Sequence, residues 1–253
     1  RKIALVIGNS NYSIPPMLAL RNPVNDAKLI AKTLREINFD DVILETDINT
    51  FEEMNQVIDN FEEKRKNYEV ALIYYAGHGI EHSFNNKPEN YLLPTAVKIT
   101  KPGELRYKAV SAQRFLDALD WSRKTLGRKD QSNIFILDAC RDNPLESVFD
   151  PEMSRTSGVF KGKGLAEITT PQGSLIAFST KPGQTAADGT GNNSLYTKVL
   201  SKKLLEKNVL VNQIFQNVRN EVIAISTKAR REPVQIPVEE NQLTGDLVLN
   251  EQH

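Results

Sequence analysis

Cysteine, histidine and net charge are all scarce in this chain, and each shortage removes a class of function. The single cysteine, Cys140, cannot form an internal disulfide, a CxxC redox pair or a cysteine-rich zinc site. There are three histidines, one of them the terminal His253, so we expect no histidine metal centre. The 32 basic and 32 acidic residues balance, so charge gives no reason to expect nucleic acid or a membrane as a partner.

Long hydrophobic runs are missing as well. The run at residues 70–76 is typical, and it is far shorter than the roughly 20 residues of a membrane-spanning helix. No signal peptide is visible, and the chain starts at Arg1 with a strand-like run. We therefore expect an excised domain whose neighbouring domains are missing from this sequence. Nothing in the chain encodes a compartment, and a cytoplasmic location is the default expectation.

Apolar runs alternate along the chain with segments of helical periodicity. This alternation predicts an α/β fold with a mostly parallel six-stranded sheet and helices on both faces. Thr50 and Glu53 form a capping box, and Ser111 is expected to cap another helix. The expected strands are residues 3–8, 42–44, 70–76, 134–137 and 174–179, with a last short strand at 247–249, and the other expected helices are 22–37, 195–207 and 211–228. Residues 85–108 are expected to form a long polar connection.

Two polar motifs follow the third and fourth expected strands. Gly77-His78-Gly79 ends the third strand, and Cys140 ends the fourth within ILDACRDNP, residues 136–144. Ligands of open α/β sheets bind beyond the carboxyl ends of the strands, so His78 and Cys140 are expected to meet there. A histidine can hold the proton of a thiol and leave a nucleophilic thiolate, while the backbone amides of Gly79 and Cys140 could bind an oxyanion.

Each motif alone also has an ordinary structural explanation. A lone cysteine in a parallel strand is usually a small buried residue, and GHG alone is usually a turn. His82 is expected to be a surface loop residue. A protein phosphatase loop would need arginine at position 146, which is Glu146, and the glycines near Lys163 do not have the spacing of a phosphate-binding loop.

Several stretches along the whole chain resemble one family. They are ALVIGNSNY (4–12), LRNPVNDAKLIAKTL (20–34), LIYYAGHG (72–79), NYLLP (90–94), FILDACRDNP (135–144), GSLIAFSTKPGQTAADGTGNNSLYTKVL (173–200) and VRNEV (218–222). The chain is similar to the caspase-like cysteine peptidases, a clan of caspases, metacaspases and paracaspases, and most to the bacterial orthocaspases. The resemblance implies one three-layer caspase-like domain over residues 1–253, with a large-subunit-like half at 1–150, a flexible linker at 151–164 and a small-subunit-like half at 165–253.

The resemblance also implies a catalytic dyad. His78 matches the catalytic histidine of the family and Cys140 its nucleophile, and the amides of Gly79 and Cys140 match the oxyanion hole. The cysteine motif differs from that of animal caspases, which reads QAC[RQG]G, because DACRD stands here.

Substrate preference is expected to follow the charge of the pocket for the P1 side chain. Metacaspases and paracaspases hold a P1 arginine or lysine with acidic residues, and Asp26, Asp138 and Asp188 match that pocket. Carboxylates pair strongly with guanidinium, so the resemblance predicts protein or peptide substrates cleaved after Arg, less well after Lys, and not after Asp. As isolated residues the three would be read as a helix-start, a strand-end and a turn aspartate.

The linker at 151–164 is rich in glycine and carries three basic residues. Arg155, Lys161 and Lys163 are candidate self-cleavage sites, and an ordinary solvated loop is the alternative interpretation. Calcium activates many metacaspases, but no EF-hand-like ligand series is present, so we expect no metal and no other cofactor. Both a monomer and a homodimer are compatible with the resemblance.

Three hypotheses from different classes follow. The first is a cysteine endopeptidase that cleaves after basic residues through a thioester acyl-enzyme. The second is a catalytically silent caspase-like binding or regulatory module, which the presence of both His78 and Cys140 disfavours. The third is a nucleotide-binding switch domain, which is disfavoured because Gly8-Asn9-Ser10-Asn11 after the first strand has one glycine only.

Overall fold

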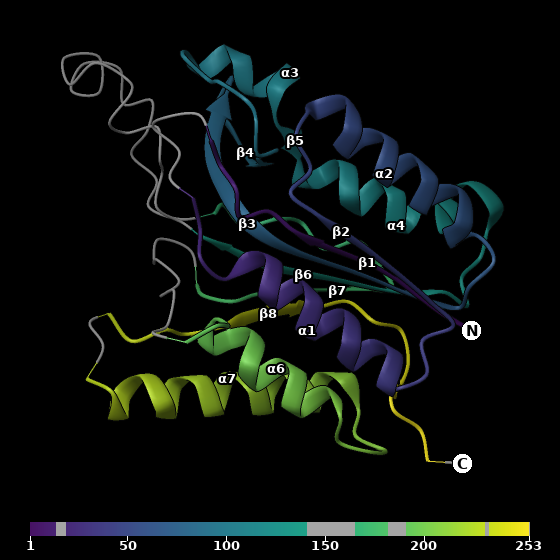
Figure 1. The fold of residues 1–253 in the computed structure, drawn as a ribbon. Coiled ribbons are helices and arrows are strands. Elements are labelled where there is room, and N and C mark those ends of the chain that lie inside the picture. The colour runs from purple at the N-terminus through teal and green to yellow at the C-terminus, as the bar shows by residue number, and fades with distance from the viewer. Residues whose placement is uncertain (14–18, 141–164, 182–190, 231–232, 253) are drawn as a thin grey trace.

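A computed structural model describes residues 1–252 except 14–18, 141–164, 182–190 and 231–232, and for Cys140 it describes the backbone only. The described chain forms three layers, with a central sheet between two sets of helices (Figure 1). The elements are β1 (Lys2–Gly8), α1 (Pro23–Glu36), β2 (Asp41–Thr46), α2 (Phe51–Arg65), β3 (Val70–Phe84), β4 (Lys87–Leu92), a 3-10 turn (Pro102–Glu104), α3 (Leu105–Lys108), β5 (Val110–Ser111), α4 (Ala112–Leu126), β6 (Ser132–Cys140), β7 (Ser174–Phe178), α6 (Leu195–Leu204), α7 (Val211–Lys228) and β8 (Val238–Asn241).

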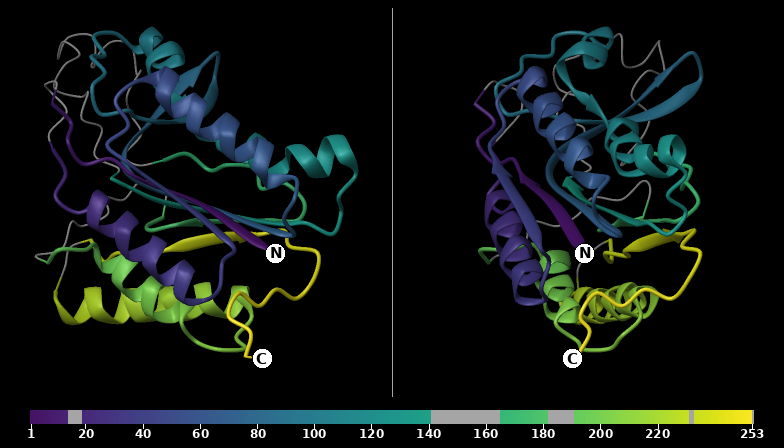
Figure 2. Two further views of the ribbon diagram at one scale, coloured as in Figure 1. Left: turned by 45° about the vertical axis from the view of Figure 1, so that its right-hand side comes forward. Right: turned by 90° about the vertical axis from the view of Figure 1, so that its right-hand side faces the viewer.

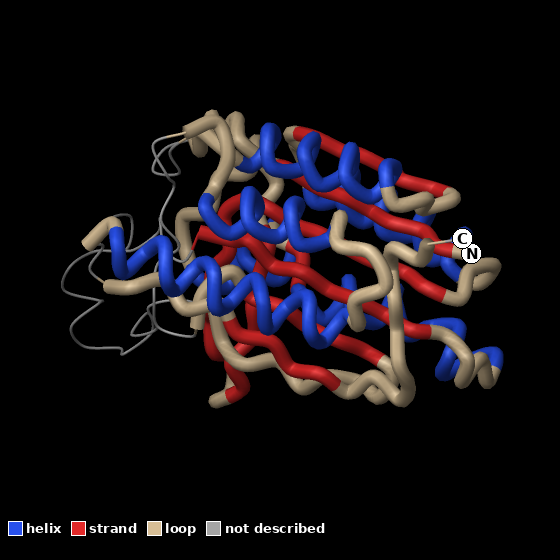
Figure 3. The backbone as a smooth tube through the Cα atoms, turned by 90° about the horizontal axis from the view of Figure 1, so that it is seen from below, coloured by secondary structure: helices blue, strands red, loops and turns tan. Residues whose placement is uncertain are grey.

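Within the described chain, the main sheet has the strand order β2-β1-β3-β6-β7-β8. The neighbours pair in parallel from β2 to β7, and β8 pairs antiparallel to β7. Helices α2 and α4 cover one face, while α1, α6 and α7 cover the other, as the end-on view in Figure 2 and the view of the second face in Figure 3 show. The expected α/β fold with a mostly parallel sheet is therefore confirmed. Six strands form the main path as expected, and β4 and β5 extend the sheet beyond β3 to eight strands within the described chain.

Alternation along the strands explains why both faces are covered. In β1, Ile3, Leu5 and Ile7 join the hydrophobic cluster under α2 and α4, while Ala4 and Val6 join the cluster under α1, α6 and α7. All five side chains have no exposed surface. Successive residues of a strand point to opposite faces, so a run that is apolar throughout has to be buried on both sides.

Helix caps agree with the expected helix starts. Thr50 Oγ1 accepts from Glu53 N–H at 3.1 Å, and the Glu53 carboxylate accepts from Asn49 N–H at 2.9 Å. Ser111 Oγ accepts from Gln113 N–H at 3.2 Å at the start of α4. These contacts satisfy backbone donors that have no partner within the helix, and so they determine where α2 and α4 begin.

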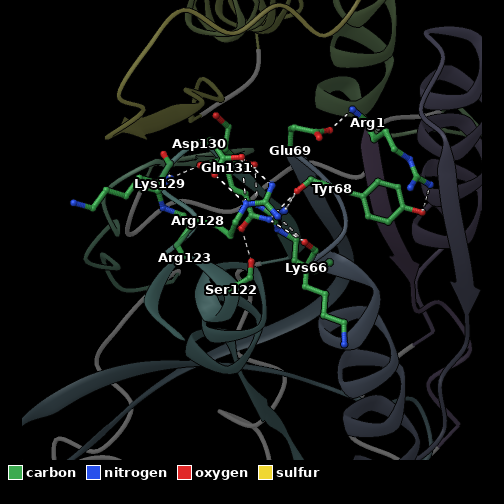
Figure 4. A network of polar contacts seen from close by, with 12 residues as sticks. Arg1, Lys66, Tyr68, Glu69, Ser122, Arg123, Arg128, Lys129, Asp130 and Gln131 are labelled. Atoms are coloured by element: carbon green, nitrogen blue, oxygen red, sulfur yellow. Dashed lines mark hydrogen bonds and ion pairs between the residues drawn. The ribbon is translucent and has the colours of Figure 1, made fainter. Parts of the chain in front are cut away.

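A polar network joins the amino ends of β3 and β6, far from the carboxyl ends of the strands. The Gln131 amide donates to the Tyr68 carbonyl at 2.9 Å and accepts from the Ser122 hydroxyl (Figure 4). The fully buried guanidinium of Arg65 donates to Tyr68 O at 2.5 Å and to Asn133 Oδ1 at 2.6 Å. A slip of one residue would turn every side chain to the other face, so a network that fixes this end also aligns the other end.

The third strand is longer than the sequence analysis expected. Instead of stopping at GHG, β3 continues to Phe84 and pairs antiparallel with β4 through a turn at Asn85 and Asn86, whose φ angles are 52° and 61°. His82 therefore lies in a strand and is 5% exposed, so its interpretation as a surface loop residue was wrong. The polar connection expected over 85–108 likewise contains β4 and α3.

The last strand was also expected in the wrong place. It runs over Val238–Asn241 and not over residues 247–249, of which Val248 forms a single bridge to Leu210. The extended segment 238–241 pairs with the edge of β7, where backbone hydrogen bonds are available, whereas Leu247 and Leu249 pack against the hydrophobic cluster under α6 and α7. Packing outside the sheet explains why this apolar run is not a strand.

Candidate active site

His78 and Cys140 occupy neighbouring positions on adjacent strands. β3 and β6 pair in parallel from Val70 and Ser132 up to His78 and Cys140, which are direct partners in the register. The two residues were expected to meet at one edge of the sheet, and the pairing of their backbones confirms this. Their role as a catalytic dyad stays a prediction.

Two tyrosine hydroxyls hold the backbone of His78. The His78 N–H donates to the Tyr12 hydroxyl at 2.8 Å, and the Tyr75 hydroxyl donates to the His78 carbonyl at 3.0 Å. The Tyr12 ring also packs edge-on against the imidazole, with ring centroids 4.4 Å apart. The imidazole is 5% exposed, so its position depends on these neighbours.

Gly77 makes room for both hydroxyls. A Cβ at this position would lie 2.7 Å from the Tyr12 oxygen and 2.8 Å from the Tyr75 oxygen, closer than a carbon can approach. Glycine in the GHG motif is thus explained by close packing against the two hydroxyls that hold His78. Tyr12 and Tyr75 have no predicted role from the sequence, although both lie in stretches, ALVIGNSNY and LIYYAGHG, that carry the family resemblance.

Removing the Tyr12 hydroxyl is expected to impair catalysis more than binding. Tyr12→Phe keeps the ring against the imidazole but leaves the buried His78 N–H without its acceptor, which costs about 1–3 kcal/mol. We expect kcat on a P1-Arg peptide to fall about tenfold with KM nearly unchanged, as steady-state kinetics would measure. Tyr91→Phe is the matched control, because its hydroxyl bonds Glu89 instead. An unchanged kcat in Tyr12→Phe would show that His78 does not need this contact.

Gly79 follows His78 in β3 and lies in a tightly packed position. A Cβ here would lie 3.1 Å from Ala139 Cβ and 3.1 Å from Leu165 Cδ2. The backbone therefore lies close to β6 on one side and to the segment that starts at Leu165 on the other. The role of the Gly79 and Cys140 amides as oxyanion donors stays a prediction.

Asp26 and Asp138 come together from α1 and β6. Asp26, in the first turn of α1, is 2% exposed, and Asp138, two residues before Cys140, is 7% exposed. Ser194, the N-cap of α6, connects them: its N–H donates to Asp26 Oδ1 at 3.0 Å and its hydroxyl donates to Asp138 Oδ2 at 2.7 Å. The structure thus brings together two of the three residues predicted for the P1 pocket.

Burial makes this pair electrostatically unusual. Burial first, and the charge of Asp138 second, raise the pKa of Asp26 to about 7, although hydrogen bonds from Asn193 and Ser194 oppose the shift. Within the part of the chain that the structure describes, neither carboxylate forms a salt bridge. No cation among the described residues balances the two carboxylates, and a guanidinium or ammonium group would be a favourable partner for them.

The remaining predicted site residues lie outside the described residues. These are Asp188 of the predicted acidic pocket and the self-cleavage candidates Arg155, Lys161 and Lys163. Among described residues, no group of three or more histidine, cysteine, aspartate or glutamate side chains is arranged to hold a metal ion. In the same part of the chain, no helix is both long enough and apolar enough to cross a membrane.

Solved structures share this fold. The structure of pro-sf-caspase-1 matches with a TM-score of 0.70, covering 100% of this chain and 91% of that chain at 17% identity. Caspase-1 from Spodoptera frugiperda matches with a TM-score of 0.67, covering 100% of this chain and 90% of that chain, again at 17% identity. The three-layer arrangement is therefore the caspase fold.

Sequence comparison finds relatives in human and mouse. The human mucosa-associated lymphoid tissue lymphoma translocation protein 1 is 30% identical over 141 residues, which is 55% of this chain and 15% of that protein. Its mouse homologue matches over the same shares at the same identity. The matched part is thus a small fraction of each relative. The family model for the caspase domain, of the C14 peptidases, matches residues 1–248. Because that match covers nearly the whole sequence, this chain belongs to the caspase-domain family of cysteine peptidases.

Proposed function

We propose that this chain is a cysteine endopeptidase that cleaves after arginine and, less well, after lysine. The Cys140 thiolate attacks the P1 carbonyl carbon, and the amides of Gly79 and Cys140 bind the oxyanion. Protonated His78 gives its proton to the leaving amine, which leaves a thioester on Cys140. His78 then takes a proton from water, the hydroxide attacks the thioester, and the P1 carboxylate and the thiol are released.

The buried pair Asp26 and Asp138 carries the proposal of basic specificity. Both carboxylates lie where β6 ends, next to the strand positions of His78 and Cys140, and each is held by polar neighbours. Guanidinium suits such a pair better than ammonium, because its planar fork can donate to two carboxylates at once. A P1 aspartate would add a negative charge to a buried acidic site, which costs several kcal/mol.

The direct test is hydrolysis of fluorogenic peptides with Arg, Lys or Asp at P1, with and without calcium. We expect turnover of Arg above Lys, and at least about 10³-fold lower kcat/KM for Asp. Iodoacetamide provides a clean control, because Cys140 is the single thiol of the chain and alkylation should abolish turnover. Equal turnover of the Asp peptide would contradict the acidic pocket, and silence on all peptides would favour a binding module.

Self-processing in 151–164 is a separate prediction, and that segment lies outside the described residues. If Arg155, Lys161 or Lys163 is a cleavage site, wild-type protein should yield two fragments on expression, whereas Cys140→Ala should stay intact. Intact-mass spectrometry would identify the bond. The triple variant Arg155→Ala/Lys161→Ala/Lys163→Ala should also stay intact, and Glu152→Ala in the same segment is the control. Identical fragments from Cys140→Ala would attribute the cut to another protease.

A further inference from the structure

Among the described residues, the hydrogen bonds to the Asp138 carboxylate come from hydroxyl groups. Its Oδ2 accepts from the Ser194 hydroxyl at 2.7 Å, from the Thr197 hydroxyl at 2.8 Å and from the Tyr74 hydroxyl at 3.3 Å. Ser194 and Thr197 belong to the start of α6, and Tyr74 comes from β3. We call these three residues the hydroxyl cradle. Donors from β3 and from the start of α6 thus converge on the Oδ2 atom of Asp138.

The cradle donates hydrogen bonds to the Asp138 carboxylate through its hydroxyl protons. Each hydroxyl has one proton, and the Thr197 proton goes to Asp138. The Tyr74 oxygen lies 2.6 Å from Thr197 Oγ1, so Tyr74 donates to Thr197 or to Asp138. Burial, with the charges of Asp138 and Asp26, raises the pKa of Tyr74 well above its ordinary value, so Tyr74 keeps its proton. Hydroxyl donors favour the charged form of the carboxylate that accepts them.

Asp26 has a different environment from Asp138. It accepts from the Asn193 amide at 2.8 Å and from the Ser194 N–H at 3.0 Å, whereas the 2.7 Å hydrogen bond of the Ser194 hydroxyl goes to Asp138. Of the residues that the structure describes, the other titratable groups that face the pair are Tyr74 on β3 and Tyr196 on α6, both fully buried phenols whose pKa is raised. No cation from α1, β3, β6 or α6 pairs with either carboxylate in the described part of the chain.

We propose that Tyr74, Ser194 and Thr197 are positioning residues that hold the Asp138 carboxylate in the P1 pocket, and that Asp26 is the carboxyl that releases a proton when a basic side chain enters. This inference rests on the proposed basic specificity. Below about pH 7, the unoccupied pair holds one proton, on Asp26. When a guanidinium enters, the Asp26 O–H bond breaks, the proton goes to the buffer, and both carboxylates are charged against the single positive charge.

The direction of the pH dependence follows from this proton balance. Binding requires Asp26 to be ionised, so affinity for a P1-Arg peptide is full at high pH and is lost as the pH falls through about 7, the value to which the Asp26 pKa is raised. Loss of the Thr197 hydroxyl removes a hydrogen-bond donor from the carboxylate pair. The pair then holds its proton more tightly, and the rise in affinity moves to higher pH.

Calorimetry on the Cys140→Ala protein tests the coupling of peptide binding to proton release, because this variant does not cleave the peptide. Titrating an uncleaved P1-Arg peptide at pH 6.5, in two buffers of different ionisation enthalpy, gives both Kd and the number of protons released. We expect release of between roughly one half and one proton per peptide bound. Adding Thr197→Val, which removes the hydroxyl and keeps the shape, should weaken binding about tenfold, and Thr197→Ser should restore it.

Control variants distinguish a positioning role of the cradle from a general effect on folding. Ser201→Ala removes another hydroxyl of α6, one that donates to Lys198 O, and should leave Kd and proton release unchanged. Thr197 is preferred to Ser194 for the first test, because Ser194 also caps the helix through Thr197 N–H. Binding without proton release, or unchanged Kd in a folded Thr197→Val, would overturn the role of the cradle. If the peptide did not bind at any pH to folded protein, the proposed basic specificity would fail, and this inference with it.

Discussion

Cys140→Ala is expected to lower kcat on a P1-Arg peptide by at least about 10³-fold, because no other thiol can form the thioester. His78→Ala should have a loss of similar size, since the thiol would then have no neighbour to hold its proton and the leaving amine no acid. The double variant should be no worse than either single variant, because the two residues act as one unit. Steady-state and single-turnover kinetics would measure all three.

Binding and folding provide the controls for this result. Neither variant changes Asp26 or Asp138, so the Kd of an uncleaved P1-Arg inhibitor should stay within about twofold of wild type. Thermal melting should show an intact fold, because β3 and β6 remain paired from Val70 and Ser132 onward. If Cys140→Ala retained one tenth or more of the wild-type rate, the nucleophile would have to be another residue.

The strand ends that form the site were predictable because the signals are local. Residues 3–8, 70–76 and 134–137 are apolar without interruption, which indicates strands buried on both faces, and His78 and Cys140 come directly after two of them. Parallel neighbours align their carboxyl ends, so the meeting of the two residues followed from the fold class.

The continuation of β3 was missed although the sequence carries a signal for it. Ile80, His82 and Phe84 alternate with Glu81 and Ser83, as in a strand, and the two following asparagines adopt the positive φ angles of a tight hairpin turn. The GHG motif was interpreted as a stop because glycine usually marks a turn. Here Gly77 admits two tyrosine hydroxyls instead, and this packing is visible only in three dimensions.

The hydroxyl cradle could not be predicted, because its contacts are not local. Tyr74 and Thr197 are 123 positions apart, and Ser194 and Asp138 are 56 apart. In the sequence, Tyr74 has the pattern of a core residue of a buried strand, and Ser194 only that of a helix cap. Proximity of these side chains depends on how α6 packs across the sheet, which no spacing rule supplies.

Asp26→Asn is expected to lower kcat/KM for a P1-Arg peptide by about 10²- to 10³-fold, mainly through KM. The loss of one partner of a buried charge pair costs roughly 3–5 kcal/mol, and the remaining Asp138 would face the guanidinium alone. The rise in affinity near pH 7 should also disappear, because the group that titrates there is gone. Asp117→Asn, which removes an exposed carboxylate paired with Lys124 on α4, is the matched control and should change neither quantity.

The free energy of unfolding of Asp26→Asn should rise while its kcat/KM falls. This difference distinguishes the loss of a binding group from damage to the fold. Because burial and Asp138 raise the pKa of Asp26 from 3.8 to about 7, ionised Asp26 opposes folding. This cost is absent below pH 3.8, grows between the two values, and reaches at most roughly 4 kcal/mol above pH 7. Asparagine keeps the shape and removes the charge, so Asp26→Asn should be more stable than wild type at pH 8, by urea denaturation, and similar to it near pH 4. A variant that lost both P1-Arg cleavage and stability at pH 8 would mean that Asp26 serves the fold and not the pocket.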